Sequence, residues 1–385
     1  MPGLEDPEHR AMQGFFERLA RLMRGRASDH VRIAFYGDSN MTLDLMSGPV
    51  RRAVQTLHGD GGHGYIAVGK PWKWYDHWDV SHKAAGPWEM HTPGNRRSKD
   101  LGFGLSGVVA TAIAKGANAT YATAPEDSPV GHAVSRFGTF YNVNSKGGAF
   151  EVRVDGKAEA TVNTSEGAGP TGYHVVKVPD GPHQFELVSL SNQPVRMYGV
   201  TMEREQPGVV VDMLGIVGIS YYDLARFDET INASLLQQRP YDLILFQVGL
   251  NSWMAADNPY SVGRLADFHR KANPNVSILV MSPPDHTKKV TDSNSDIQFI
   301  HIAEGLHRAA QEHGVAFFDF WNAMGGDGSM ARFFHKNLTG KDLYHFTRKG
   351  ASFMASRIVY AIWTRFNEYL QEHPEAGCGE DVRRP

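Results

Sequence analysis

The chain has 385 residues, of which 41% are hydrophobic and 21% charged, values typical of a globular protein with two or three domains. Its formal net charge of −3 gives no electrostatic basis for binding nucleic acid or an anionic membrane surface, so neither is expected as a partner. A single cysteine, Cys378, excludes an internal disulfide framework and a thiolate metal cluster. No apolar run is long enough to predict a transmembrane segment, and residues 1–30 lack the apolar core of a signal peptide.

The first elements are a predicted helix and a predicted buried strand. Residues 8–24 place apolar side chains at helical spacing, and residues 31–36 are rich in β-branched and aromatic side chains. The polar sequence Asp-Ser-Asn at 38–40 follows, and its residues are good N-caps for a helix through Met41–Met46. Taken alone, Ser39 is explained about equally well as a helix cap and as a nucleophile.

The pattern changes between residues 86 and 206. Helical periodicity is absent there, and short alternating runs are separated by Gly, Asn and Asp. Asp155-Gly156 stands between two such runs and predicts a hairpin turn. We therefore expect residues 86–206 to form an antiparallel β-sandwich.

From residue 207 onward, continuous apolar strands alternate with amphipathic helices. This pattern predicts a mainly parallel sheet with helices on both faces, which is a three-layer α/β/α fold of the flavodoxin-like type. The strand before Ser39 has no parallel partner nearby in the sequence, so it is expected to join this later sheet. We thus predict a discontinuous domain of residues 1–85 and 207–370, with 86–206 inserted and 371–385 as a flexible tail.

Several polar residues follow the ends of the predicted parallel strands, where open α/β sheets bind ligands. A serine hydroxyl becomes nucleophilic when a histidine takes its proton and a carboxylate orients the imidazole. The developing oxyanion needs preorganised donors, which backbone N–H groups and an amide side chain supply. The candidates are Ser39, Asp342 and His345 for the triad, and Ser39, Gly218 and Asn251 for the oxyanion hole, with Gly215 as an alternative glycine.

Each candidate has a simpler explanation. Asp342 can cap the last helix, His345 can be a surface residue, and Asn251 can be a turn former. Taken singly these simpler explanations are favoured, but their coincidence at successive strand ends favours acyl transfer.

The motifs resemble those of the SGNH (GDSL-type) hydrolases. They read "YGDSN" around Ser39, "LGIVGIS" around Gly218, "VGLN" ending at Asn251, and "DLYH" from Asp342 to His345. The resemblance implies a serine nucleophile, a histidine base, an orienting aspartate and an oxyanion hole of the two backbone N–H groups and the amide. It implies no cofactor and no metal. It covers residues 25–85 and 207–370 but not the β-rich insert, and Asn40 stands where Leu or His is commoner.

A narrower resemblance is to bacterial peptidoglycan O-acetylesterases of this clan, on the leading helix, the "GDGGHGY" loop at 59–65 and the position of the β-rich insert. It implies that residues 86–206 are a carbohydrate-module-like, jelly-roll-like β-domain. It also implies an esterase that removes O-acetyl groups from a polysaccharide, in the periplasm or after secretion, with any signal peptide absent from this chain. The same triad also suits an O-acetyltransferase that uses a sugar acceptor, or a glycan-binding protein with a vestigial site.

An aromatic stretch near the candidate site has two interpretations. Its aromatic residues are either core packing or a partly exposed wall for stacking sugar rings. A cation at "DHWDVSH", residues 76–82, is a weaker alternative for the same stretch. The tentative substrate-binding residues are Trp72, Trp74, Tyr75 and Trp78.

Overall fold

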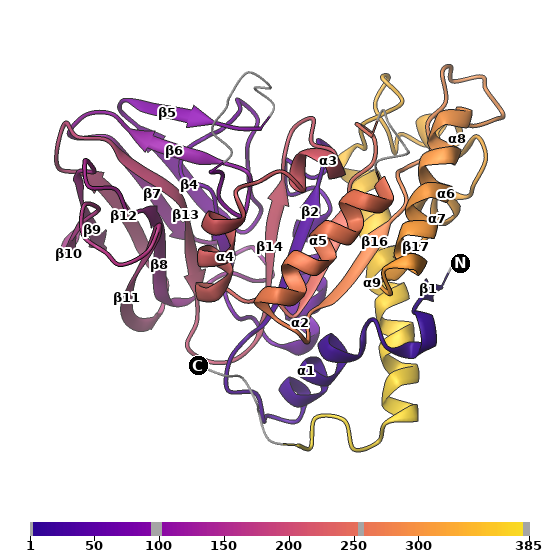
Figure 1. Ribbon diagram of the computed structural model, residues 1–385, viewed down its shortest axis with the longest axis horizontal. Coiled ribbons are helices and arrows are strands. Elements are labelled where there is room, and N and C mark those ends of the chain that lie inside the picture. Colours follow the sequence, from indigo (N-terminus) through magenta and orange to yellow (C-terminus); the bar gives the residue numbers. More distant parts are fainter. Residues whose placement is uncertain (1–2, 94–101, 253–257, 380–385) are drawn as a thin grey trace.

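The computed structural model describes residues 3–93, 102–252 and 258–379. A six-stranded sheet lies between two layers of helices (Figure 1). Neighbouring strands pair in parallel, except for the antiparallel edge pair of β1 with β17. In spatial order the strands are β1 (Leu4–Glu5), β17 (Ala316–Phe318), β16 (Ser277–Met281), β15 (Leu243–Gln247), β2 (Val31–Gly37) and β14 (Val209–Gly215).

The strand that precedes Ser39 is an interior strand of this sheet, next to the edge strand β14. Strand β2 pairs with β14 on one side and with β15 on the other, with Ile33 opposite both Val211 and Leu243. The prediction that this strand joins the later sheet is confirmed. Its seven residues are all buried, as expected for a parallel strand with both faces covered.

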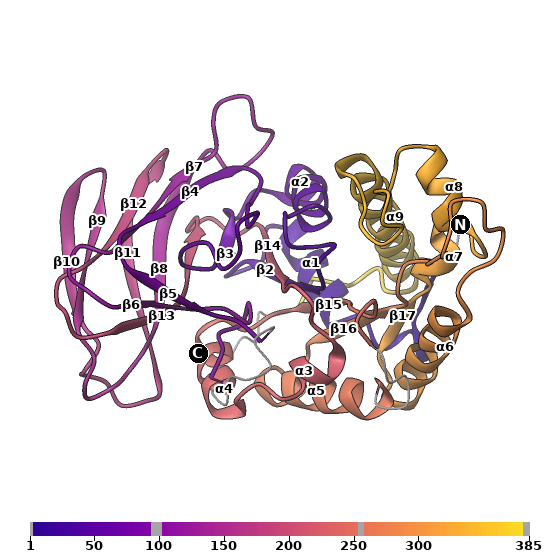
Figure 2. The same cartoon turned by 90° about the horizontal axis from the view of Figure 1, so that it is seen from above.

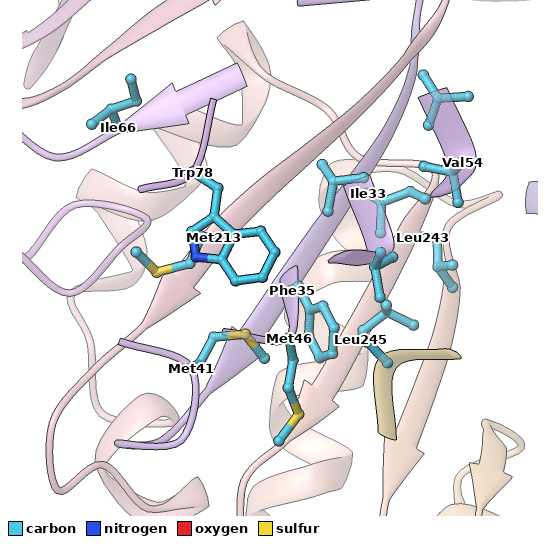
Figure 3. Packing of buried hydrophobic residues seen from close by; sticks show 14 of the residues in the cluster. Ile33, Phe35, Met41, Met46, Val54, Ile66, Trp78, Met213, Leu243 and Leu245 are labelled. Carbon is cyan, nitrogen blue, oxygen red and sulfur yellow. The ribbon is translucent and has the colours of Figure 1, made fainter. Parts of the chain in front are cut away.

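Successive side chains of a strand point to opposite faces of the sheet and pack in two different hydrophobic cores. Ile33 and Phe35 pack in one core, and Ala34 and Tyr36 in the other, which is the period-two alternation of a strand. In Figure 3, Phe35 lies beside Met46 in the first core. Helices on the two faces of the sheet supply further residues of both cores (Figure 2). They are α1 (Gln13–Met23), α2 (Ser47–His58) and α9 (Arg348–Glu372) for the first core, and α4 (Glu229–Gln238), α5 (Asn258–Ala272) and α6 (Ile297–Glu312) for the second.

The chain after Ser39 differs from the prediction. Residues 38–46 form turns, and the helix begins only at Ser47. Asp44 has a φ of +55°, which no helix accommodates, and its carboxylate accepts from the Ser47 hydroxyl and pairs with Arg51. The predicted helix through Met41–Met46 is therefore wrong, because Asp44 ends any helix in this stretch. Short helices elsewhere are η1 (Pro7–His9), α3 (Tyr221–Leu224), α7 (Phe320–Met324) and α8 (Ser329–His335).

Two antiparallel sheets lie beside the edge strand β14 (Figure 1). Phe137 of one sheet stacks on Phe185 of the other, with ring centroids 4.6 Å apart. Their strands begin before residue 86, because β4 pairs with β7 and β3 pairs with β13. In spatial order, the strands of the first sheet are β10 (Lys157–Asn163), β9 (Ala149–Val154), β12 (Gln184–Ser189), β7 (Asn118–Thr123) and β4 (Val80–Ala85). Those of the second sheet are β11 (Thr171–Gly181), β8 (Val134–Asn142), β13 (Val195–Glu203), β6 (Val109–Ala112) and β5 (Trp88–His91). The short strand β3 (Gly64–Ile66) also pairs with β13.

A buried ionic network joins these antiparallel sheets to the parallel sheet. Glu203, at the end of β13, is fully buried and accepts from Arg32 of β2 at 3.1 Å. It also accepts from Arg239, after α4, and from Arg136 of β8, both at 2.6 Å. Arg239 in turn pairs with Asp212 of β14 at 2.6 Å. Charges from five elements thus meet at one buried junction.

The end of α9 lies inside the predicted tail. The Arg24 guanidinium donates to the carbonyls of Pro374 and Ala376, and the Gly377 N–H donates to Glu17 of α1. The stretch up to Cys378 is therefore held against α1, and residues 380–385 lie outside the described residues. Across the described ranges, no helix combines the length and the apolar character needed to cross a membrane.

Candidate active site

Ser39 lies just beyond the carboxyl end of β2, where the chain turns back over the sheet edge. Gly37 makes this turn possible, because a Cβ there would lie 2.7 Å from the Cβ of Met41. Gly215, in the neighbouring strand, has the same role, because a Cβ added there would lie 2.6 Å from the Cβ of Met41. Both glycines therefore let Met41 pack down between two strand ends, which leaves Ser39 above them.

The side chains of Ser39, His345 and Asp342 form a continuous hydrogen-bonded line. Ser39 Oγ lies 2.8 Å from His345 Nε2, and His345 Nδ1 lies 2.7 Å from Asp342 Oδ2. The second carboxylate oxygen of Asp342 accepts from the backbone N–H groups of Tyr344, at 3.0 Å, and His345, at 3.1 Å. This is the arrangement of a nucleophile, a base and an orienting carboxylate.

The charge on Asp342 determines which imidazole nitrogen carries the proton. Partial burial acts to raise the pKa of Asp342, but hydrogen bonds from the His345 side chain and backbone hold it below its ordinary value. Asp342 is therefore a carboxylate at neutral pH and accepts the Nδ1 proton of His345. In the neutral imidazole this leaves Nε2 as the acceptor for the Ser39 hydroxyl.

The oxyanion-hole candidates Ser39, Gly218 and Asn251 lie on three loops, which follow β2, β14 and β15. Asn251 follows β15, and its Nδ2 donates to the carbonyl of Ile219, 3.1 Å away, next to Gly218. Gly218 has a φ of +72° with open space where a Cβ would stand, whereas Gly215 is closed off by Met41. Among the described residues, no hydrogen-bond partner is found for the Gly218 or Ser39 N–H groups. These features favour Gly218 over Gly215 as a donor.

Asp38 contributes to the site in a way that the sequence analysis missed. Its side chain is fully buried, and Oδ1 accepts from the Asn40 N–H at 3.1 Å. Burial raises the pKa of Asp38 to about 6, although the backbone N–H groups of Asn40 and Leu250 act in the opposite direction. Asp38 thus connects the Ser39 turn to the loop that carries Asn251. The signal in the sequence is its place directly before Ser39, a place that the sequence alone explains as a helix cap.

Of the four aromatic residues predicted to bind substrate, Trp74 alone has an exposed side chain. Trp74 is 51% exposed, and its Nε1 donates to Thr42 Oγ1, whose hydroxyl donates to the carbonyl of Ser39. Tyr75 is buried with its hydroxyl bonded to the Ala67 N–H, so it cannot stack on a sugar.

Trp78 is also buried, because Arg52 and Arg348 lie against its ring at 4.9 and 4.4 Å. Trp72 is partly buried against the edge of Tyr75. The wall predicted for Tyr75 and Trp78 is corrected to core packing, because the stretch folds inward beneath Trp74.

The histidines of residues 76–82 pack in the interior as well. His77 Nδ1 lies 3.1 Å from His63 Nε2, and its Nε2 lies 2.7 Å from the Tyr75 hydroxyl. Burial lowers the pKa of His63 and His77 well below the ordinary value, so both are neutral. Within the ranges that the structure describes, no three His, Cys, Asp or Glu side chains are grouped so as to hold a metal ion.

The fold is similar to that of a solved structure described as "Peptidoglycan O-acetylesterase in action, 5 min". That structure matches with a TM-score of 0.79 at 21% sequence identity, over 95% of this chain and 99% of the other. The match shows a shared mixed α/β fold. Models of protein families and curated proteins gave no match.

Further solved structures match less well. A family two carbohydrate esterase from Cellvibrio japonicus is 10% identical and covers 79% of this chain and 98% of its own, with a TM-score of 0.30. A putative GDSL-like lipase from Parabacteroides merdae is 16% identical over 41% of this chain and 73% of its own, with a TM-score of 0.33. Similarities at this level carry no argument about this chain.

Proposed function

We propose that the protein is a serine esterase that removes O-acetyl groups from a polysaccharide, with a peptidoglycan-like glycan as the substrate. The observation that carries this proposal is the hydrogen-bonded line from Ser39 through His345 to Asp342. The shared fold with a structure described as a peptidoglycan O-acetylesterase supports the choice of substrate.

The first half of the reaction transfers the acetyl group to Ser39. His345 Nε2 takes the hydroxyl proton while Ser39 Oγ attacks the acetyl carbonyl carbon. The resulting oxyanion is stabilised by the N–H groups of Ser39 and Gly218 and by the Asn251 amide. When the intermediate collapses, the bond to the sugar oxygen breaks, and this oxygen takes the proton from His345.

The second half returns the enzyme to its starting state. A water molecule gives a proton to His345 Nε2 and attacks the acetyl-serine carbonyl through the same oxyanion site. Collapse releases acetate, and Ser39 Oγ regains its proton from His345. Because the side chains of His345 and Asp342 are 49% and 51% exposed, water reaches the base readily. This exposure favours hydrolysis over transfer to a sugar acceptor.

The test is an acetate-release assay on O-acetylated peptidoglycan and on p-nitrophenyl acetate, each with and without an acceptor sugar. Acetate release from both substrates, unaffected by the acceptor, is the expected result. Acetylation of the acceptor at the expense of free acetate would instead assign an O-acetyltransferase. No turnover of either substrate would leave only a glycan-binding role.

We expect Asn251→Ala to lower kcat for p-nitrophenyl acetate by about a hundredfold or more, with little change in KM. The amide acts on the oxyanion, which exists only along the reaction path, and one such donor is worth roughly 3–4 kcal/mol. Steady-state kinetics on the purified variant measure both constants. A large rise in KM at unchanged kcat would assign Asn251 to substrate binding instead.

Trp74 is the aromatic residue that we propose for stacking a sugar ring beside Ser39. Trp74→Ala should raise KM for O-acetylated peptidoglycan roughly fivefold, equivalent to about 1 kcal/mol of stacking, and leave p-nitrophenyl acetate hydrolysis unchanged. Tyr360→Ala is the matched control, since Tyr360 is 57% exposed on α9. If both substrates respond equally to Trp74→Ala, the residue shapes the acetyl site and does not bind glycan.

The domain bounds and the cellular compartment are part of the same proposal. We propose that residues 1–85 and 207–370 form the catalytic domain, apart from β3 and β4, which pair with strands of 86–206 in an inserted β-sandwich that helps to hold the glycan. A peptidoglycan-like substrate places the reaction outside the cytoplasm, in the periplasm or after secretion.

Deletion of residues 86–206 is a poor test of their role in holding the glycan. It would remove Glu203 and leave Arg32 and Arg239 buried without this carboxylate.

A further inference from the structure

Asn40 connects the turn that holds Ser39 to the loop that holds His345. It is 1% exposed, and its Nδ2 donates to the carbonyl of Tyr344, 3.1 Å away. Its Oδ1 accepts from the N–H of Phe346, 2.9 Å away. The Asn40 side-chain amide thus forms one hydrogen bond to the backbone before His345 and one to the backbone after it. The backbone of a neighbouring β-strand makes the same kind of pair.

Hydrogen bonds within the loop around His345 fix its shape. The His345 carbonyl accepts from Thr339 Oγ1 at 2.7 Å and from the Gly340 N–H at 2.8 Å. Leu343 has a φ of +58°, which the surrounding hydrogen bonds must hold in place. Leu343 and Phe346 are buried in the same core as Met41, so packing anchors the loop coarsely, and the hydrogen bonds to the Ser39 turn set its exact position.

Three hydrogen bonds join residues 38–42 to residues 339–346 in the part of the chain that the structure describes. One is the bond between Ser39 and His345, and the other two are those of the Asn40 side chain. The first bond is lost each time the serine proton moves to the imidazole. Of the three hydrogen bonds, the two made by Asn40 persist through the reaction.

We propose that Asn40 is a positioning residue that holds His345 Nε2 at hydrogen-bond distance from Ser39 Oγ. This rests on the proposed esterase function, in which His345 is the base. The His345 side chain is about half exposed, so packing alone does not immobilise it. A displacement of about 1 Å between the nucleophile and its base can cost a hundredfold in rate, which gives the two hydrogen bonds a catalytic consequence.

A double-mutant cycle with His345 tests this role. Asn40→Ala should lower kcat for p-nitrophenyl acetate by about 10- to 100-fold and change KM by less than about twofold. In the His345→Ala background the same substitution should cause no further loss, because the residue it positions is gone. A merely structural role would lower the residual activity in both backgrounds alike.

Asn232→Ala is the matched control. Asn232 is also buried, and its Nδ2 donates to the carbonyl of Phe103, which is a similar link to a distant segment. It should lower thermal stability like Asn40→Ala but keep the wild-type kcat. Asn40→Asp provides a second test variant if Asn40→Ala does not fold. The aspartate side chain keeps the size of asparagine and the oxygen that accepts from the Phe346 N–H, but it loses the N–H that donates to the Tyr344 carbonyl. It should therefore show an intermediate loss of kcat.

Two results would overturn the proposal. One is wild-type kcat in a folded Asn40→Asp or Asn40→Ala variant, and the other is an equal loss with and without His345. Failure of the esterase assignment itself is distinguishable, because it appears as no turnover by the wild type or as retained activity in Ser39→Ala, whereas failure of this inference concerns Asn40 alone.

Discussion

Ser39→Ala should lower kcat for p-nitrophenyl acetate by about 10⁴-fold or more, because the nucleophilic oxygen is removed from the hydrogen-bonded line. His345→Ala should have an effect of similar size, since the hydroxyl then has no base at 2.8 Å. The double variant should be no slower than either single variant, because the two side chains act as a unit. Burst and steady-state kinetics on the three proteins measure these effects.

Ser356→Ala is the control for the serine substitution, because Ser356 is exposed on α9 and bonds only to its own helix, at the Phe353 carbonyl. It should behave as the wild type. Near-native turnover by Ser39→Ala, in a protein with unchanged thermal stability, would show that the nucleophile is misassigned.

Glu203→Ala should lower the free energy of unfolding by about 3–5 kcal/mol, which is the effect of removing one partner from a buried ionic group. The substitution leaves Arg32, Arg239 and Arg136 around an empty, desolvated position at the junction of the sheets. Equilibrium unfolding in urea, followed by tryptophan fluorescence, measures the difference.

The pH dependence of stability gives this prediction a second signature. Burial acts to raise the pKa of Glu203, but the charges of Arg32, Arg239 and His30 outweigh it and hold the pKa well below the ordinary value. A lowered folded-state pKa gives stability that is present above the unfolded-state pKa of about 4.3 and is lost as the pH falls further. Wild-type stability should therefore fall more steeply in acid than that of Glu203→Ala.

Glu205→Ala is the control for this substitution. Glu205 lies two residues further along the chain, and its side chain is 55% exposed beside Lys177. Its removal should leave unfolding almost unchanged, because exposed ion pairs contribute little. Equal destabilisation by the two substitutions would contradict the account of the buried network.

Much of the fold could be predicted because its signals are local or repetitive. The apolar strands from residue 207 onward identify a parallel sheet, and the lack of a nearby partner for β2 places this strand in the same sheet. Ser39 is found because it follows the end of a parallel strand, where such sheets bind ligands. Asp342 and His345 are found from their motif, and the structure places them in the loop between α8 and α9, 306 positions from Ser39 for His345.

The features that were missed depend on contacts between distant segments. Nothing near Asp44 in sequence indicates its positive φ, which follows from its pairing with Arg51 and with the Trp78 N–H. Tyr75 and Trp78 have the composition of a sugar-binding wall, and only the tertiary packing shows that they are buried. Asn40 looks like a helix cap until the loop of residues 344–346 is placed against it.

The central claim is that an acetyl group passes from a glycan to Ser39 and then to water. The most direct measurement is mass spectrometry of the intact protein, quenched in acid during turnover of O-acetylated peptidoglycan, followed by peptide mapping. The account predicts a transient gain of one acetyl group, located on the peptide that contains Ser39 and absent from Ser39→Ala. Acetate release without acetylation of Ser39, or acetylation of another residue at the same rate as turnover, would contradict it.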